Sequence, residues 1–145
     1  MNAYARDHAR GQWAAALRSR GAKVDAFDDW SQNGGRGPPD QSALQVRTGN
    51  ETKLQEPDMQ HRSLLLVYPP PGDMATKCLA AYRGNTLIYV GEGRGGVCAD
   101  ASFFDAMDRN WVLKEKRDLD PFPGAFERMY VFRRKSSGFL SFMAW

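Results

Sequence analysis

The stretch that decides the fold runs from Leu64 to Gly96 and reads LLLVYPPPGDMATKCLAAYRGNTLIYVGEGRGG. An apolar run, Leu64–Tyr68, ends at three prolines, and a second run, Thr86–Val90, follows a stretch with helical spacing. Parallel strands that are buried on both faces read as continuous apolar runs, so this pattern predicts a β-α-β unit. We therefore expect an α/β fold, a three-layer Rossmann-like arrangement around a mostly parallel sheet.

Two aspartates are expected to begin helices in this region, because a short acidic side chain can accept a hydrogen bond from the first helical turn. Asp73 precedes the helix inside the β-α-β unit, and Asp100 precedes a second helix after the glycine-rich loop. Both helices carry an apolar stripe that we expect to face the core. The stripe residues are Met74, Cys78, Leu79 and Tyr82 in the first helix, and Phe103, Phe104, Met107 and Trp111 in the second.

The flanking segments supply the remaining elements. Tyr4–Arg20 has the apolar spacing of a helix, Gly21 is a natural helix stop, and Val24–Phe27 reads as a short strand that ends in Asp28-Asp29. Near the other end, Val112–Leu119 and Arg128–Arg133 are separated by too few residues for a crossover helix. This last pair is therefore predicted to be antiparallel.

The length of 145 residues fits one domain, which we place at residues 1–135. Residues 30–60 are rich in Gly, Pro, Asn and Gln and are expected to form a long loop or lid, with Ala43–Val46 as its strand-like fragment. Residues 136–145 form an apolar C-terminal tail.

Composition excludes several classes of protein. The longest apolar stretches are far shorter than the roughly 20 residues that span a bilayer, and the net charge of +3 is spread along the chain rather than gathered in one basic segment. No membrane or nucleic-acid partner is therefore expected. Cys78 and Cys98 are read as free thiols, and with His8 and His61 they make no metal-binding pattern. A cytoplasmic location is expected, with mitochondrial import through the Arg-rich start as the alternative.

The glycine-rich loop offers one chemical alternative. Gly91-x-Gly93-x-x-Gly96 matches the dinucleotide-binding fingerprint, follows a strand and precedes a helix, with Asp118 and Asp120 a little over twenty residues on. This pattern is compatible with an NAD-type oxidoreductase, although the helix is expected to begin only at the Asp100 cap. Glu92 stands at the carboxyl end of a strand and is the candidate catalytic residue, as a general base or through a hydrogen bond to a ligand hydroxyl.

The order of the elements resembles a class I, S-adenosylmethionine-dependent methyltransferase that starts after its first strand. GQWAAALRSRGAKVDAFD, residues 11–28, looks like the helix and second strand that follow the glycine loop in this superfamily. LLLVYPPPGDMA and LIYVGEGRGG resemble a poorly characterised methyltransferase-like group. The resemblance implies a seven-stranded sheet whose last strand is antiparallel, with the cofactor across the carboxyl ends of its first half.

By this resemblance, Gly11 is the last glycine of the cofactor loop and Asp28 binds the ribose hydroxyls. Tyr68, also a candidate cofactor contact, begins the acceptor-side loop, in which Pro69 and Pro70 are the candidate substrate contacts. Two departures follow. The first strand is expected to be absent, and the other glycines of the loop are replaced by residues 7–10, DHAR. The sequence thus predicts methyl transfer from S-adenosylmethionine to an unknown acceptor, impaired by the lost loop. A non-catalytic remnant or interaction module of the same fold is the alternative, and the sequence indicates no oligomeric state.

Overall fold

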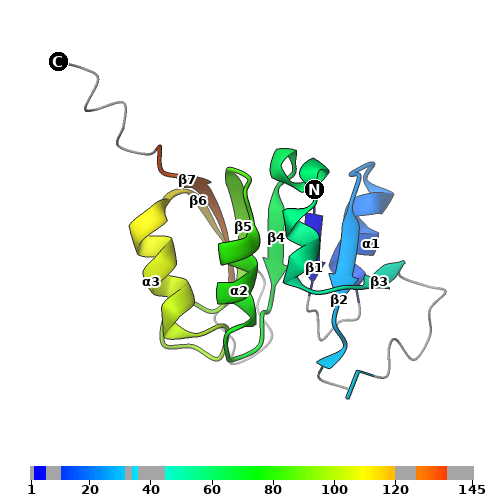
Figure 1. The fold of residues 1–145 in the computed structure, drawn as a ribbon. Helices are drawn as coiled ribbons and strands as arrows, with labels where there is room; N and C mark the ends of the chain where they lie inside the picture. The colour runs from blue at the N-terminus through cyan, green and yellow to red at the C-terminus, as the bar shows by residue number, and fades with distance from the viewer. Residues whose placement is uncertain (1, 6–10, 32–33, 36–44, 120–126, 137–145) are drawn as a thin grey trace.

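The computed structural model describes the backbone of residues 2–5 and the whole of residues 11–31, 34–35, 45–119 and 127–136. In this part of the chain, seven strands form one sheet in the order β3-β2-β1-β4-β5-β7-β6 (Figure 1). The strands are β1 (Asn2–Ala5), β2 (Asp25–Asp28), β3 (Val46–Thr48), β4 (Leu64–Val67), β5 (Thr86–Gly91), β6 (Trp111–Asp118) and β7 (Arg128–Arg134).

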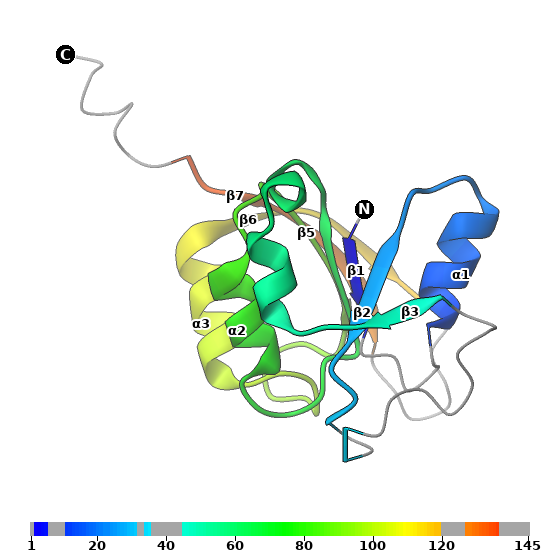
Figure 2. The same ribbon diagram turned by 45° about the vertical axis from the view of Figure 1, so that its right-hand side comes forward.

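The first five strands run parallel, and β7 runs antiparallel to both of its neighbours, β5 and β6. The helices are α1 (Gln12–Ser19), α2 (Met74–Ala81) and α3 (Ala101–Asn110), with two 3₁₀ helices, η2 (Glu51–Gln55) and η3 (Pro57–His61). Figure 2 shows α1 on one side of the sheet and α2 and α3 on the other. The predicted three-layer α/β class with an antiparallel C-terminal pair is confirmed.

Each face of the sheet has its own hydrophobic core. The core beneath α2 and α3 is the larger, and it includes Leu64, Leu66, Leu87, Tyr89 and Phe103. The core beneath α1 contains Leu65, Val67 and Val90 from the alternate positions of the same strands. All four residues of β4 are buried, as expected for a strand with helices on both faces.

The expectation that the first strand is absent is wrong. Residues 2–5, NAYA, form β1 at the centre of the sheet, where β1 pairs with β2 on one side and with β4 on the other. The predicted helix Tyr4–Arg20 is therefore too long, and α1 covers only Gln12–Ser19. Its end was predicted correctly, because Gly21 adopts a left-handed conformation with φ of 86° just after the helix. The sequence pattern did not identify this strand because NAYA lacks an apolar run like the LLLV of the equally short β4.

The two predicted aspartate caps differ. Asp100 Oδ1 accepts a hydrogen bond from Phe103 N at 2.9 Å, which confirms the cap of α3. Asp73 lies at the N-cap position of α2, but its side chain makes no capping hydrogen bond and forms an ion pair with Lys77 at 2.9 Å instead. The expectation that the Asp73 carboxylate caps α2 is therefore wrong.

The long segment at residues 30–60 contains regular structure in its second half. The strand β3 begins at Val46, the last residue of the predicted fragment, and η2 and η3 follow with Leu54 and Met59 buried. Residues 43–44 and the tail after Ser136 lie outside the described residues.

Candidate functional site

The candidate site lies at the carboxyl edge of the parallel strands, the lower edge of the sheet in Figure 1. The register pairs Ala5 with Val67 and Val67 with Val90, so β1, β4 and β5 end at nearly the same level. Open α/β sheets bind ligands at this edge, outside the carboxyl ends of the strands. Of the predicted site residues, Asp28 is the last residue of β2, and the others come after β1, β4 or β5 in the chain.

Gly11 is buried at the N-cap position of α1, after β1 and next to the central strands. Its φ of 85° is left-handed, a conformation that glycine adopts without a side-chain clash. Its carbonyl oxygen accepts the first helical hydrogen bond, from Ala15 N at 3.0 Å. Since glycine has no side chain with which to cap the helix, the amino end of α1 presents backbone N–H groups and its positive dipole end toward the edge.

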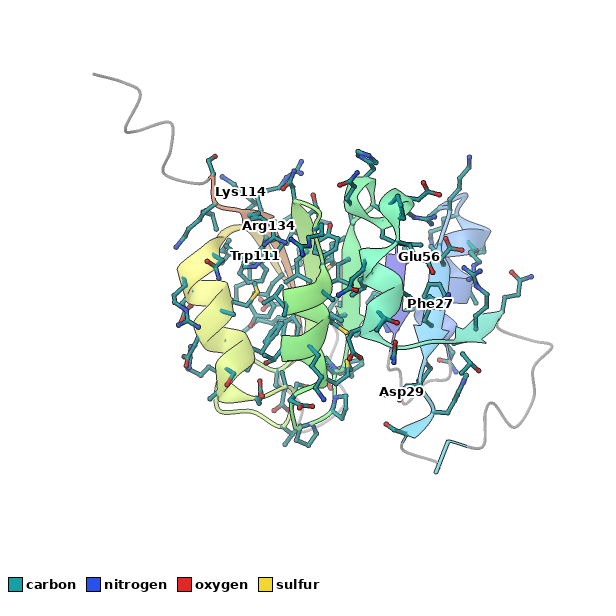
Figure 3. All side chains as sticks on the ribbon, viewed as in Figure 1. Phe27, Asp29, Glu56, Trp111, Lys114 and Arg134 are labelled. Carbon is teal, nitrogen blue, oxygen red and sulfur yellow. The ribbon has the colours of Figure 1, made fainter. Side chains whose placement is uncertain are left out.

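Asp28 is the last residue of β2, and its carboxylate organises the chain that follows. Asp28 Oδ1 accepts a hydrogen bond from Trp30 N at 2.7 Å, and Trp30 takes a left-handed φ of 57°. The Trp30 indole then donates to Thr48 Oγ1 at 3.1 Å, at the end of the neighbouring β3. Figure 3 shows Asp29, the next acid, beyond the end of β2.

Sequence reasoning found Asp28 but missed the contact between Trp30 and Thr48. The local signal was present, because aspartate often accepts a hydrogen bond from the backbone two residues ahead. The Thr48 partner required the pairing of β2 with β3, which the sequence does not reveal.

Tyr68 follows β4 directly and has a φ of 44°, unusual for a residue with a Cβ and for one that precedes proline. Its N–H donates to Val90 O at 2.8 Å, which extends the β4–β5 ladder by one bond. The ring packs, half-buried, against both hydrophobic cores at the end of the sheet. A backbone conformation of this kind costs on the order of 1–3 kcal/mol and is common at functional sites.

The proline loop after β4 and the glycine-rich loop after β5 are joined. Ala99 N lies 3.1 Å from Pro69 O and 3.2 Å from Pro70 O, a shared hydrogen bond. Thr76 Oγ1, on α2, lies 2.5 Å from Asp100 Oδ1. The Ala99 bonds link the proline loop to the start of α3, and the Thr76 bond links α2 to the same place. No sequence pattern indicated these links.

Glu92 lies just after β5, as predicted, and its carboxylate folds back into its own loop. Glu92 Oε2 accepts a hydrogen bond from Val97 N at 3.1 Å. Gly96 allows this closure, because a Cβ there would lie 2.5 Å from the Glu92 Cβ. The loop ends before α3 begins at Ala101, so its glycines do not open a helix as they do in a dinucleotide-binding loop.

The buried Tyr89 side chain holds the Glu92 loop through a hydrogen bond to its backbone. Tyr89 O–H donates to Glu92 O at 2.6 Å. Burial, with the nearby Cys98 thiol, raises the pKa of Tyr89 well above its ordinary value. Burial also raises the pKa of the Cys98 thiol, so both groups remain protonated near neutral pH. Gly91 makes room for them, since a Cβ there would lie 2.9 Å from the Tyr89 hydroxyl and 3.2 Å from Cys98 Sγ.

The topology brings the cofactor candidates together and places Glu92 at the far end. Gly11, Asp28 and Tyr68 follow β1, β2 and β4, which are three adjacent strands. Neighbouring strands are about 4.8 Å apart, so the ends of β2 and β4 are separated by about 10 Å and those of β2 and β5 by about 14 Å. Pro69 and Pro70 continue from Tyr68 toward the β5 side, where they meet Ala99.

Within the described part of the chain, no three His, Cys, Asp or Glu side chains gather to form a metal-binding group. No helix among these residues is long and apolar enough to cross a membrane.

Comparison with known proteins gives matches at the level of fold alone. No protein-family model and no curated protein matches the sequence. Among solved structures, a Streptococcus pneumoniae protein assigned as a tRNA (m1A22) methyltransferase, in complex with S-adenosyl-L-methionine, matches with a TM-score of 0.60 at 14% identity. The match covers 94% of this chain and 66% of that one.

Two further structures have the same fold. The 1,6-didemethyltoxoflavin-N1-methyltransferase of Burkholderia thailandensis, with bound 1,6-didemethyltoxoflavin and S-adenosylhomocysteine, matches with a TM-score of 0.54 at 13% identity, over 94% of this chain and 71% of that one. A TehB-like SAM-dependent methyltransferase from Corynebacterium glutamicum matches with a TM-score of 0.50 at 19% identity, over 92% and 79%. The chain therefore has the class I methyltransferase fold, and it spans about two thirds of the length of the Streptococcus protein.

Proposed function

We propose that this chain is a methyltransferase-like protein that binds S-adenosylmethionine across the carboxyl ends of β1, β2 and β4. The observation that carries the proposal is the complete strand order, with β1 between β2 and β4 and with β7 antiparallel. This is the fold of the solved methyltransferases that match the chain. In the methyltransferase fold, the cofactor loop joins the first strand to the first helix. Because β1 is present here, this chain has both of these elements, β1 and α1.

The groups at this edge fit such a ligand. Asp28 is half-buried and lies at the end of β2, so its carboxylate can accept hydrogen bonds from a ribose hydroxyl. The amino end of α1 after Gly11 offers N–H groups to the carboxylate of an amino acid moiety. Tyr68, Pro69 and Pro70 then border the acceptor side.

When bound, S-adenosylmethionine supplies an electrophilic methyl group on a sulfonium sulfur. A lone pair of the acceptor forms the new bond to carbon as the carbon–sulfur bond breaks, and S-adenosylhomocysteine and a proton leave. The residues of this chain would orient the acceptor from the proline loop, which Ala99 N holds through two carbonyl oxygens. Glu92 is the candidate to take the proton, although one of its carboxylate oxygens already accepts from Val97 N.

The direct test is calorimetry with S-adenosylmethionine and S-adenosylhomocysteine, on the wild type and on a matched pair of variants. Asp28→Asn keeps an oxygen that can accept from Trp30 N but removes the charge, and should weaken binding by roughly 10-fold to 100-fold. Asp29→Asn is the control, because Asp29 Oδ1 accepts from Ser31 N in the same way. No heat and no thermal shift at millimolar cofactor would refute the proposal. Equal loss in both variants would refute the role of Asp28.

A non-catalytic remnant or interaction module is the second candidate, favoured by the replacement of the loop glycines by residues 7–10, DHAR. The two candidates differ in turnover. Incubation with methyl-labelled S-adenosylmethionine and a mixture of small molecules and RNA should yield labelled product if the site is catalytic. Binding in calorimetry without any transfer would favour the module.

A dinucleotide-binding oxidoreductase remains the third reading, through Gly91-x-Gly93-x-x-Gly96. Its test is NADH fluorescence with the wild type and with Gly93→Val. Fluorescence enhancement that the variant abolishes would support this reading, whereas the same signal in both proteins would count against it.

A further inference from the structure

A cavity lies between α3, the strands β5 and β7, and residues Gly93 and Arg94 of the glycine-rich loop, on the β5 side of the proposed cofactor edge. Its volume is about 240 Å³. Its walls carry five aromatic rings, those of Tyr89, Phe103, Phe104, Tyr130 and Phe132.

The rings already contact one another with the geometry that aromatic pairs prefer. Tyr89 lies 5.4 Å from Phe103, 6.1 Å from Phe104 and 5.9 Å from Tyr130, measured between ring centroids. The interplanar angles of these pairs are 39°, 84° and 36°, which are tilted and edge-on rather than face to face. Separations of about 4.5–7 Å with offset or edge contacts are the favourable ones. A further ring in the cavity could make the same contacts with several walls at once.

Not all of these rings are closed off by the fold. Tyr89 and Phe103 are buried, whereas Phe104, Tyr130 and Phe132 are only half-buried. Among the described residues, three of the five aromatic walls are therefore accessible in part, beside the exposed Arg94 and Asp108.

The two charged residues that line the cavity, Arg94 and Asp108, compensate each other. Arg94 forms ion pairs with Asp105 at 2.9 Å and with Asp108 at 2.8 Å. The Arg94 guanidinium also lies 5.6 Å from the centroid of the Phe104 ring. The two charged residues of the lining are therefore paired with each other, and a charged ligand would have to break that pair. The site is therefore complementary to an uncharged ligand.

The volume limits the size of that ligand. A cavity of about 150 Å³ accommodates benzene, and pockets for drug-sized molecules begin near 300 Å³. At about 240 Å³, the cavity has room for one ring with small substituents. We propose that this cavity binds a small, uncharged, single-ring aromatic molecule. The proposal does not depend on methyl transfer.

The test uses p-cresol as the probe and 4-methylcyclohexanol as a comparison of similar shape without an aromatic ring. Binding to the full chain would be followed by protein-observed NMR titration. For p-cresol we expect saturable shifts confined to α3, β5 and β7, with a Kd on the order of 1 mM. For 4-methylcyclohexanol we expect binding at least threefold weaker, because it lacks the ring contacts.

Three variants locate the site. Phe104→Ala removes one half-buried wall and should weaken p-cresol binding at least fivefold. Phe104→Leu keeps apolar bulk and should reduce the preference for p-cresol, because four of the five rings remain. Val112→Ala is the control, because this 39% exposed side chain lies on β6 and does not line the cavity. Shifts that do not saturate, shifts that map elsewhere, equal binding of both probes, or p-cresol binding unchanged in folded Phe104→Ala would each overturn the proposal. Circular dichroism establishes that each variant is folded.

Discussion

Replacing Asp100 with alanine is expected to destabilise the protein by about 2 kcal/mol, whereas Asp73→Ala should cost less than about 0.5 kcal/mol. Both aspartates precede a helix, but their contacts differ. Asp100 Oδ1 accepts from Phe103 N at 2.9 Å and lies 2.5 Å from Thr76 Oγ1. Loss of a cap typically costs about 1 kcal/mol, and loss of a hydrogen bond to a charged group costs about 1.5 kcal/mol or more when the partner stays partly buried.

Asp73 contributes much less by the same reasoning. Its carboxylate makes no capping bond, and its ion pair with Lys77 lies on the surface, with 65% and 54% of the two side chains exposed. Exposed ion pairs contribute about 0–1 kcal/mol. The Asp100 carboxylate also joins α3 to α2 through Thr76, so its loss should loosen the link between the two loops of the candidate site.

Urea unfolding followed by circular dichroism gives both free energies. At roughly 3–4 °C per kcal/mol for a chain of this size, Asp100→Ala should lower Tm by about 6–8 °C. Asp100→Asn, which keeps an acceptor oxygen, should recover at least half of the loss. A double-mutant cycle with Thr76→Val should give a coupling of about 1 kcal/mol. Equal losses for Asp100→Ala and Asp73→Ala, or zero coupling to Thr76, would show that the contacts assigned to Asp100 are wrong.

Three further predictions concern the support of the site. Arg134→Lys should lower the free energy of unfolding, measured in urea, by about 2 kcal/mol. The Arg134 guanidinium lies 4.4 Å from the centroid of the Trp111 ring (Figure 3), and it donates to two backbone carbonyls. Arg133→Lys should change the same free energy by less than about 0.5 kcal/mol. Gly84→Ala should cost about 1–3 kcal/mol by the same measurement, since its Cβ would lie 2.5 Å from a carbon of the Tyr82 ring; an unchanged midpoint would contradict this packing. The raised pKa of Tyr89 predicts stability that is complete below the ordinary phenol pKa and is lost as pH rises above it, because only the unfolded phenol then ionises freely. Tyr89→Phe should flatten this alkaline loss between pH 9 and 11, and an equally steep loss in the variant would assign it to another group.

The elements that could be predicted from the sequence are those that depend on residues close together in the chain. The apolar runs of β4 and β5 lie in buried strands, and the Asp100 cap and the Gly21 stop fall where their residue types place them. Each of these features depends on a backbone or side-chain preference within a few residues. The candidate site residues Asp28 and Glu92 were placed at strand ends because the apolar run gives way to polar residues or glycine there, and Tyr68 because three prolines end its strand.

The short first strand and the contacts between loops were decided by the tertiary structure alone. The segment NAYA has no apolar run like that of the equally short β4, and β1 exists because β2 and β4 offer it hydrogen-bond partners on both sides. The bond from Ala99 to the proline loop joins residues about thirty positions apart, which become neighbours only when β4 and β5 pair in register. The sequence by itself thus determined the class of fold and the edge that carries the candidate site. The presence of β1 between β2 and β4 depends on pairing between segments that are distant in the sequence. Such pairing leaves no local pattern in the chain.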